Sequence, residues 1–71
     1  MERNIQLNWS ALVKEAVKRR KQAKITQKEL AVLAGVSKPT VIRFEHGEGN
    51  ITLNSALAIL QCLGLLNNHP L

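Results

Sequence analysis

Residues 26–47 of this 71-residue chain read TQKELAVLAGVSKPTVIRFEHG, and this stretch decides the fold. Thr26 begins it and Glu29 follows three positions later, which is the spacing of a helix-starting capping box. Gly35 can end the helix, because a residue beyond the last turn often takes the left-handed conformation that glycine adopts at little cost. The first half of the stretch therefore predicts one short helix, whose buried side carries Leu30, Ala31, Leu33 and Ala34.

A second short helix follows at once in the same stretch. Ser37 can cap it, and Pro39 lies in its first turn, where the missing N–H costs little. Val41 and Phe44 supply its apolar side before Gly47 stops it. The sequence therefore predicts two short helices joined by a three-residue turn, Gly35-Val36-Ser37.

The segments on both sides of this pair also have helical patterns. Ser10 can cap a helix that runs to about Gln22, and Thr52 can cap one that ends near Gly64. The apolar face expected for the last helix carries Leu53, Leu57, Leu60 and Leu63.

These patterns define one domain. We expect an all-α fold of four to five helices at residues 10–66, preceded by an N-terminal arm at 1–9 and followed by a tail at 67–71. A chain this short buries only about 60% of its unfolded surface, so its stability should be small.

The charge distribution limits the classes of partner that the protein is expected to bind. The net charge is +5, the isoelectric point is about 10.0, and all ten Lys and Arg residues fall between Arg3 and Arg43. A basic surface of this kind suits phosphate backbones or anionic membranes. No stretch approaches the roughly 18 apolar residues of a membrane span. We therefore expect a cytoplasmic protein that binds no membrane.

The residue types that carry catalysis are scattered. Two histidines, one cysteine and five acids show no triad order, metal-ligand spacing or phosphate loop. We therefore expect no enzyme, no cofactor and no metal. Cys62 has no partner for a disulfide, and within an apolar run it is expected to be a small buried hydrophobe, with a reactive thiol as the alternative.

The two-helix stretch resembles the phage Cro and lambda-repressor-like family, also called Xre-type regulators. The resemblance is carried by Gln27, Leu30, Ala31, Ala34, Gly35, Val36, Ser37, Val41, Phe44, Glu45 and Gly47. It implies a helix-turn-helix whose second helix enters the major groove of double-stranded DNA. The function it implies is sequence-specific transcription regulation, with repression as the expected mode and a homodimer as the expected binding unit.

The resemblance also implies roles for individual residues. Arg20 and Glu45 occupy the positions of a structural ion pair. The positions that contact bases are held here by Lys38, Pro39 and Arg43. The fork of Arg43 suits guanine, Lys38 suits guanine or phosphate, and Pro39 or Thr40 suits a thymine methyl. The family often carries glutamine where Lys38 and Pro39 stand, so the operator sequence stays open.

Phosphate contacts are expected around these base-reading positions. Gln27, at the start of the first short helix, is the expected clamp on a phosphate, with an exposed polar residue as the alternative. Ser37, His46 and Asn50 are further phosphate candidates, and for His46 simple exposure is the competing interpretation.

The last helix raises the question of a protein partner. If Leu53, Leu57 and Leu60 point inward, Ile59 and Cys62 face outward and would need a second subunit to cover them. A fuller monomer core is the alternative. The same region also resembles DNA-binding antitoxins, which would add a toxin protein as a partner. A protein-interaction module that has lost DNA binding is the remaining alternative.

Overall fold

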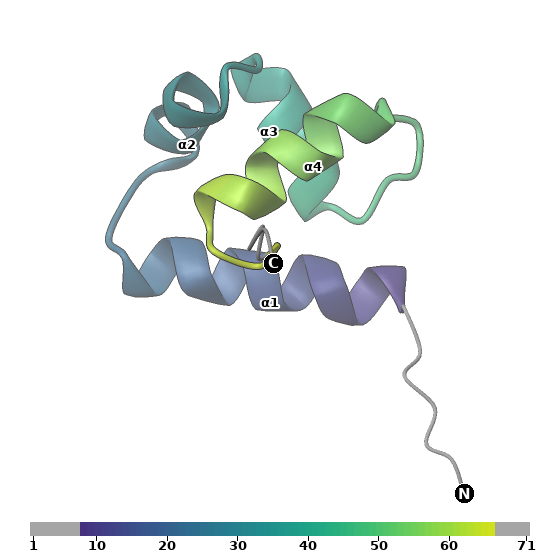
Figure 1. Cartoon of the computed structure of the whole chain (residues 1–71), viewed down its shortest axis with the longest axis horizontal. Coiled ribbons are helices and arrows are strands. Elements are labelled where there is room, and N and C mark those ends of the chain that lie inside the picture. Colours follow the sequence, from purple (N-terminus) through teal and green to yellow (C-terminus); the bar gives the residue numbers. More distant parts are fainter. Residues whose placement is uncertain (1–7, 67–71) are drawn as a thin grey trace, which may run out of the picture.

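The structure, a computed structural model, describes residues 8–66 and contains four helices in that range. They are α1 (Trp9–Gln22), α2 (Gln27–Ala34), α3 (Lys38–Glu45) and α4 (Leu53–Cys62). Figure 1 shows α1 lying along one side of the other three helices, with α4 in front of α3. Every regular element among the described residues is a helix, which confirms the all-α prediction.

The first helix begins earlier than expected. Its N-cap is Asn8, whose side-chain oxygen accepts a hydrogen bond of 3.2 Å from the backbone N–H of Ala11, so the prediction of Ser10 as the cap is wrong. Trp9 therefore belongs to the helix and not to an arm. Residues 1–7 and 67–71, where the rest of the arm and the tail were predicted, lie outside the described part of the chain.

One hydrophobic core joins all four helices. It is almost wholly aliphatic, with one buried aromatic ring, and consists of Val13, Ala16, Leu30, Ala31, Val41, Phe44, Ile59, Leu60 and Leu63. Full burial of one such large side chain stabilises a fold by about 1.5 to 3 kcal/mol. Because Phe44 and Val41 are completely buried, one side of α3 is fixed against this core.

The buried face of α4 agrees with the predicted one at Leu60 and Leu63, which are buried, and differs from it at Leu53 and Leu57. Leu53 is 72% exposed and Leu57 is 36% exposed, whereas Ile59 is completely buried. Cys62 is also exposed, so its expected burial is wrong. The inward residues Ala56, Ile59, Leu60 and Leu63 recur at the same helical spacing as the predicted face, rotated around the axis. A helix that is apolar on several sides therefore offers two equally regular faces, and packing selects one.

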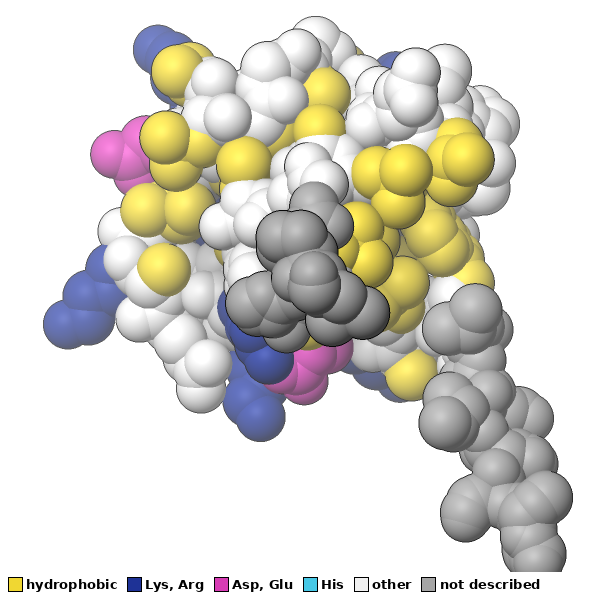
Figure 2. Space-filling model, viewed as in Figure 1, with side chains coloured by type: hydrophobic (Ala, Val, Ile, Leu, Met, Phe, Trp, Pro, Cys, Tyr) yellow, Lys and Arg dark blue, Asp and Glu magenta, His cyan; other side chains and the backbone are white. Residues whose placement is uncertain are grey.

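A similar difference occurs on α2. Leu30 and Ala31 are buried as predicted, but Leu33 is 64% exposed and its neighbour Val32 is 73% exposed. The prediction that Leu33 is buried is therefore wrong. Figure 2 shows hydrophobic side chains at the surface over α2 and beside α4.

Arg19 ties the end of α4 back to α1. Its Nη1 donates to the carbonyl oxygens of Leu63 at 3.3 Å and Gly64 at 3.2 Å, while its Nε donates to Glu15 at 3.2 Å. A cation at the last carbonyls of a helix is favourable, because these groups lack partners within the helix. Among residues 8–66 no helix is both long enough and apolar enough to cross a membrane.

Candidate nucleic-acid interface

The start of α2 has the reciprocal cap that the sequence predicts. The hydroxyl of Thr26 accepts the backbone N–H of Glu29 at 3.0 Å, and a carboxylate oxygen of Glu29 accepts the N–H of Thr26 at 2.7 Å. Each residue satisfies a donor that the helix itself leaves unpaired. The capping box is therefore confirmed.

The turn after α2 depends on the backbone of Gly35. This residue has φ 72° and ψ 30°, the left-handed conformation. The next residue, Val36, donates its N–H to the carbonyl of Ala31 at 3.0 Å. This is the 6→1 hydrogen bond of a Schellman motif. A Cβ at Gly35 would meet nothing within 4 Å, so glycine is required here by φ and not by crowding.

The third helix begins at a side-chain cap and ends at another left-handed glycine. Ser37 accepts the N–H of Thr40 at 3.2 Å, and Pro39 lies in the first turn, as predicted. The helix ends at Glu45, and Gly47 has φ 79°. Two capped helices of eight residues each are thus joined by a turn at residues 35–37.

An ion pair fixes the inner side of α3 to α1. Nε of Arg20 lies 2.7 Å from one carboxylate oxygen of Glu45, and Nη2 lies 3.2 Å from the other. Nη1 of Arg20 donates to the carbonyl of Ile25 at 2.9 Å. The side chains of Arg20 and Glu45 are 12% and 7% exposed. The expected pair is therefore present, as a bidentate and largely buried contact.

Gln27 completes this cluster from the start of α2. Its Nε2 donates to Oε1 of Glu45 at 2.9 Å, and the residue is half-buried. The alternative of a freely exposed polar residue is therefore wrong. One N–H of the amide remains beyond this bond, and the phosphate clamp stays a prediction.

The outer side of α3 carries the residues expected to read bases. On a helix with 100° between residues, Pro39 and Arg43 project roughly opposite Val41 and Phe44. Lys38 and Pro39 are exposed, and Thr40, Ile42 and Arg43 are half-buried. The reading positions thus lie on the surface side of a helix whose other side is fixed in the core.

The hydroxyl of Thr40 is already engaged on this surface. It lies 2.8 Å from the hydroxyl of Ser37, and Nη2 of Arg43 donates to it at 3.5 Å, a long and weak bond. The Thr40 hydroxyl therefore already has two partners within the protein.

This geometry matches a known family. The sequence profile of the helix-turn-helix family matches residues 18–66. The chain belongs to the Cro and lambda-repressor-like helix-turn-helix family. It is therefore a DNA-binding domain of the kind found in transcription regulators.

A named relative is similar to this helix-turn-helix domain. An uncharacterized HTH-type transcriptional regulator of Haemophilus influenzae is 43% identical to it over 54 residues. The match covers 76% of this chain and 55% of the relative. The chain thus spans about half the length of the relative it matches.

A tryptophan contact that the sequence analysis missed supports the helix-turn-helix from α1. Nε1 of Trp9 donates to the carbonyl of Gly47 at 3.1 Å, and its ring meets that of Phe44 edge-on at 5.6 Å between centroids. A sequence signal existed, because Trp9, Val13 and Ala16 recur at helical spacing. The loop that follows the helix-turn-helix is therefore held at its first residues.

The remaining phosphate candidates lie at the two ends of α3. Ser37 is exposed at its start, and His46 and Asn50 are exposed in the segment that follows its end. Within residues 8–66 no group of three His, Cys, Asp or Glu side chains could hold a metal ion. Exposed side chains with hydrogen-bond donors thus lie at both ends of α3, and their contact with phosphates stays a prediction.

Proposed function

We propose that this helix-turn-helix domain binds operator DNA as a homodimer, reads bases in the major groove with α3, and represses transcription. The observation that carries the proposal is the division of α3 into two sides. Phe44 and Glu45 are held by the core and by Arg20, while Lys38 and Arg43 project from the surface. A short helix fixed on one side and cationic on the other fits the edges of base pairs.

Each outward side chain suits a different group on the DNA. Arg43 can donate two parallel hydrogen bonds to O6 and N7 of guanine. Lys38, at the first position of α3, can reach guanine or a phosphate. Pro39 and the methyl group of Thr40 can contact a thymine methyl, since the Thr40 hydroxyl is bonded to Ser37.

Phosphate contacts would place α3 in register with the groove. Gln27 keeps one amide N–H beyond its bond to Glu45, and the first turn of α2 has N–H groups without partners in the helix. Ser37, His46 and Asn50 are exposed and carry donors. These groups lie around the reading positions and not among them, as position-setting contacts do.

The homodimer is supported by the exposed apolar side of α4. Leu53 and Leu57 project there, in place of the outward residues that the sequence analysis expected. The surface area that two such side chains can bury is far below the roughly 800 Å² per partner of a standard stable interface. We therefore propose a weak dimer that assembles on DNA, with recognition helices about 34 Å apart.

The experiment combines operator selection with mobility shift. Duplexes are selected from a random pool, and binding is then measured for the wild type, Arg43→Lys and Arg43→Ala. Arg43→Ala removes all donors of the side chain, so discrimination at one guanine per half-site should fall by about 5- to 150-fold, equivalent to about 1 to 3 kcal/mol. Arg43→Lys keeps the charge and loses the planar fork, so it should lose part of that discrimination. An enriched palindrome would support the dimer.

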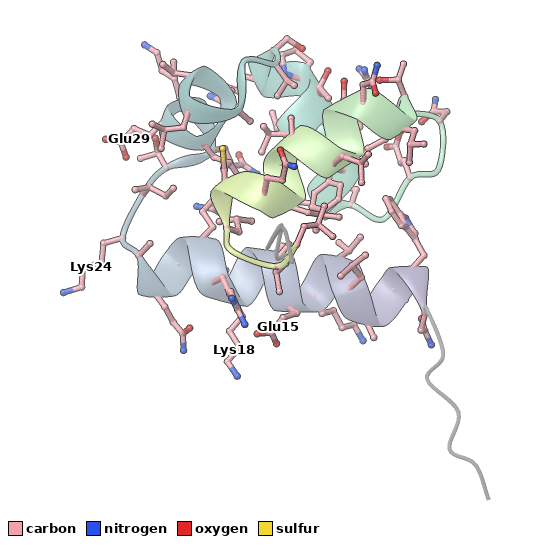
Figure 3. The ribbon with its side chains drawn as sticks, in the orientation of Figure 1. Glu15, Lys18, Lys24 and Glu29 are labelled. Carbon is pink, nitrogen blue, oxygen red and sulfur yellow. The ribbon has the colours of Figure 1, made fainter. Side chains whose placement is uncertain are left out.

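Lys18→Ala is the matched control for loss of positive charge. Lys18 is exposed on α1 and points away from the other helices in Figure 3. It should leave base discrimination unchanged. Equal discrimination by the wild type and Arg43→Ala would contradict the assignment of Arg43 as a base-reading residue, and failure to enrich any site would favour the protein-interaction module.

A further inference from the structure

A shallow depression lies between the beginning of α1 and the end of α3. It is lined by Trp9, Ser10, Val13, Lys14, Glu45, His46 and Gly47. Three of these residues carry hydrogen-bond donors in their side chains: the hydroxyl of Ser10, the ammonium of Lys14 and the imidazole of His46. Donors from two helices that are distant in sequence therefore meet at one place on the surface.

The one carboxylate in the lining does not make the depression negative. Glu45 is 7% exposed and accepts hydrogen bonds from Arg20 and Gln27. Lys14 is exposed and takes part in neither of the two ion pairs found among residues 8–66, Arg20–Glu45 and Arg19–Glu15. The uncompensated charge at the rim is therefore the positive charge of Lys14.

The two sides of the depression are held at a fixed separation. Trp9 belongs to α1 and donates to the carbonyl of Gly47 beyond the end of α3, and its ring packs edge-on against Phe44. Ser10 follows Trp9 directly, and His46 precedes Gly47 directly. The backbone segments that carry Ser10 and His46 are therefore already held together before a ligand binds, which lowers the cost of binding.

We propose that this depression is a seat for one phosphodiester of the operator backbone, with Lys14 and Ser10 as contacts in addition to His46. The proposal rests on the proposed function, because it assumes that α3 lies in the major groove. A recognition helix in the major groove has its N-terminal residues at the base edges. The end of α3, where the seat lies, is therefore expected closer to the phosphates than its start.

The chemistry of the seat favours a phosphate over a base edge. A phosphodiester offers oxygen acceptors and one negative charge, which match a cluster of donors with one cation. The seat also lies beside the end of the helix, and neither Pro39 nor Arg43 is among the residues that line it. It should therefore contribute affinity without sequence preference.

The test is the salt dependence of operator binding for Lys14→Gln, with Lys18→Gln as the matched control. Both lysines are exposed on α1 one helical turn apart, but Lys18 lines a different depression, with Glu15 and Arg19, and points away from the other helices (Figure 3). Loss of one phosphate contact lowers the slope of log K against log salt by about 0.9 per protomer. When the salt concentration is lowered from 200 to 50 mM, the affinity for the operator increases in both proteins. The increase should be about 3.5-fold smaller per protomer for Lys14→Gln than for the wild type. Lys18→Gln should match the wild type.

Ethylation interference on the same operator locates the contact. In the wild type, ethylation of one phosphate per half-site at the end of α3 should block binding, and in Lys14→Gln it should lose that effect. Lys14→Arg should restore both the slope and the interference. Circular dichroism of each variant shows that the exposed substitutions leave the fold intact.

Two results would overturn the seat. One is an unchanged slope for Lys14→Gln, and the other is an equal decrease for Lys14→Gln and Lys18→Gln, which would indicate general attraction. If Arg43→Lys loses discrimination while Lys14→Gln keeps its slope, the seat fails and the proposed function stands. If no operator is retarded by the wild type, both fail.

Discussion

Removal of the Glu45 carboxylate should cost this domain a large part of its stability. In Glu45→Ala, the guanidinium of Arg20 keeps its bond to the carbonyl of Ile25, but its Nε and Nη2 lose the carboxylate oxygens that accept their hydrogen bonds. Gln27 loses the acceptor for its Nε2 as well. Three N–H groups in a partly buried region are thus left without partners.

The magnitude follows from the burial of the pair. Arg20 and Glu45 are 12% and 7% exposed, so solvent screens their charges little. Breaking a buried pair from one side costs about 3 to 5 kcal/mol. A domain of this size has a total unfolding free energy of about 4 to 11 kcal/mol, at 0.05 to 0.15 kcal/mol per residue. Glu45→Ala should therefore lower the melting temperature by about 12 to 40 °C.

Thermal and urea unfolding followed by circular dichroism measure the effect. The control is Glu15→Ala, which removes the acid of the pair that Arg19 makes along α1. Both side chains of that pair are 42% exposed, so the change should cost at most about 0.5 kcal/mol. The double variant Arg20→Met with Glu45→Leu removes both charges and should recover most of the lost stability.

The double variant also shows whether Arg20 and Glu45 stabilise the domain as a pair or independently. If its cost equals the sum of the costs of Arg20→Met and Glu45→Leu measured singly, the residues do not act as a pair and the reasoning is wrong. A decrease of less than about 1 kcal/mol in the free energy of unfolding of Glu45→Ala would also contradict the argument from burial. Such a decrease is what the loss of a solvent-exposed ion pair causes.

Three further changes test the backbone and the aromatic contact. Lys24 has φ 61°, so Lys24→Gly should stabilise the domain by about 0.5 to 1 kcal/mol, measured as a rise in the urea midpoint. Gly35→Ala should cost about 1 to 2 kcal/mol through φ alone, and Gly35→Asn should cost less; equal costs would contradict this origin. Trp9→Phe keeps a ring against Phe44 and loses the bond to Gly47, so it should cost about 1 kcal/mol and increase amide hydrogen exchange at residues 46–49.

The sequence was most informative about features formed by residues that are close together in the chain. The capping box of Thr26 and Glu29, the turn at Gly35 and the cap at Ser37 each depend on residues within a few positions of one another. Their chemistry allows few alternatives, because a left-handed turn requires glycine and an unpaired N–H requires an acceptor. The two helices of the helix-turn-helix could therefore be predicted to within a residue.

The sequence was least informative about which face of an apolar helix is buried. Leu33 and Leu53 were expected in the core and are exposed, while Ile59 was expected outside and is buried. Periodicity identifies that a helix has an apolar face, but α4 is apolar on more than one side. The choice depends on the shape of the other helices, which no local pattern contains.

The contacts at the site were predictable only in part. The Arg20–Glu45 pair was expected from a family resemblance, because 25 positions separate the two residues and no periodic pattern connects them. The bond from Trp9 to Gly47 spans 38 positions and was missed. Gln27 was expected to face DNA, and its bond to Glu45 depends on how the start of α2 meets the end of α3.

The side chains of α3 that stabilise the fold are different from those that are proposed to contact DNA. A helix of eight residues is too short to be stable alone, so its shape depends on contacts made by its inner side chains. Val41, Phe44 and Glu45 make those contacts, while Lys38 and Pro39 are exposed. Substitutions at the exposed positions therefore change the surface offered to DNA without removing core contacts. The same scaffold can therefore carry a different side chain at each of these exposed positions.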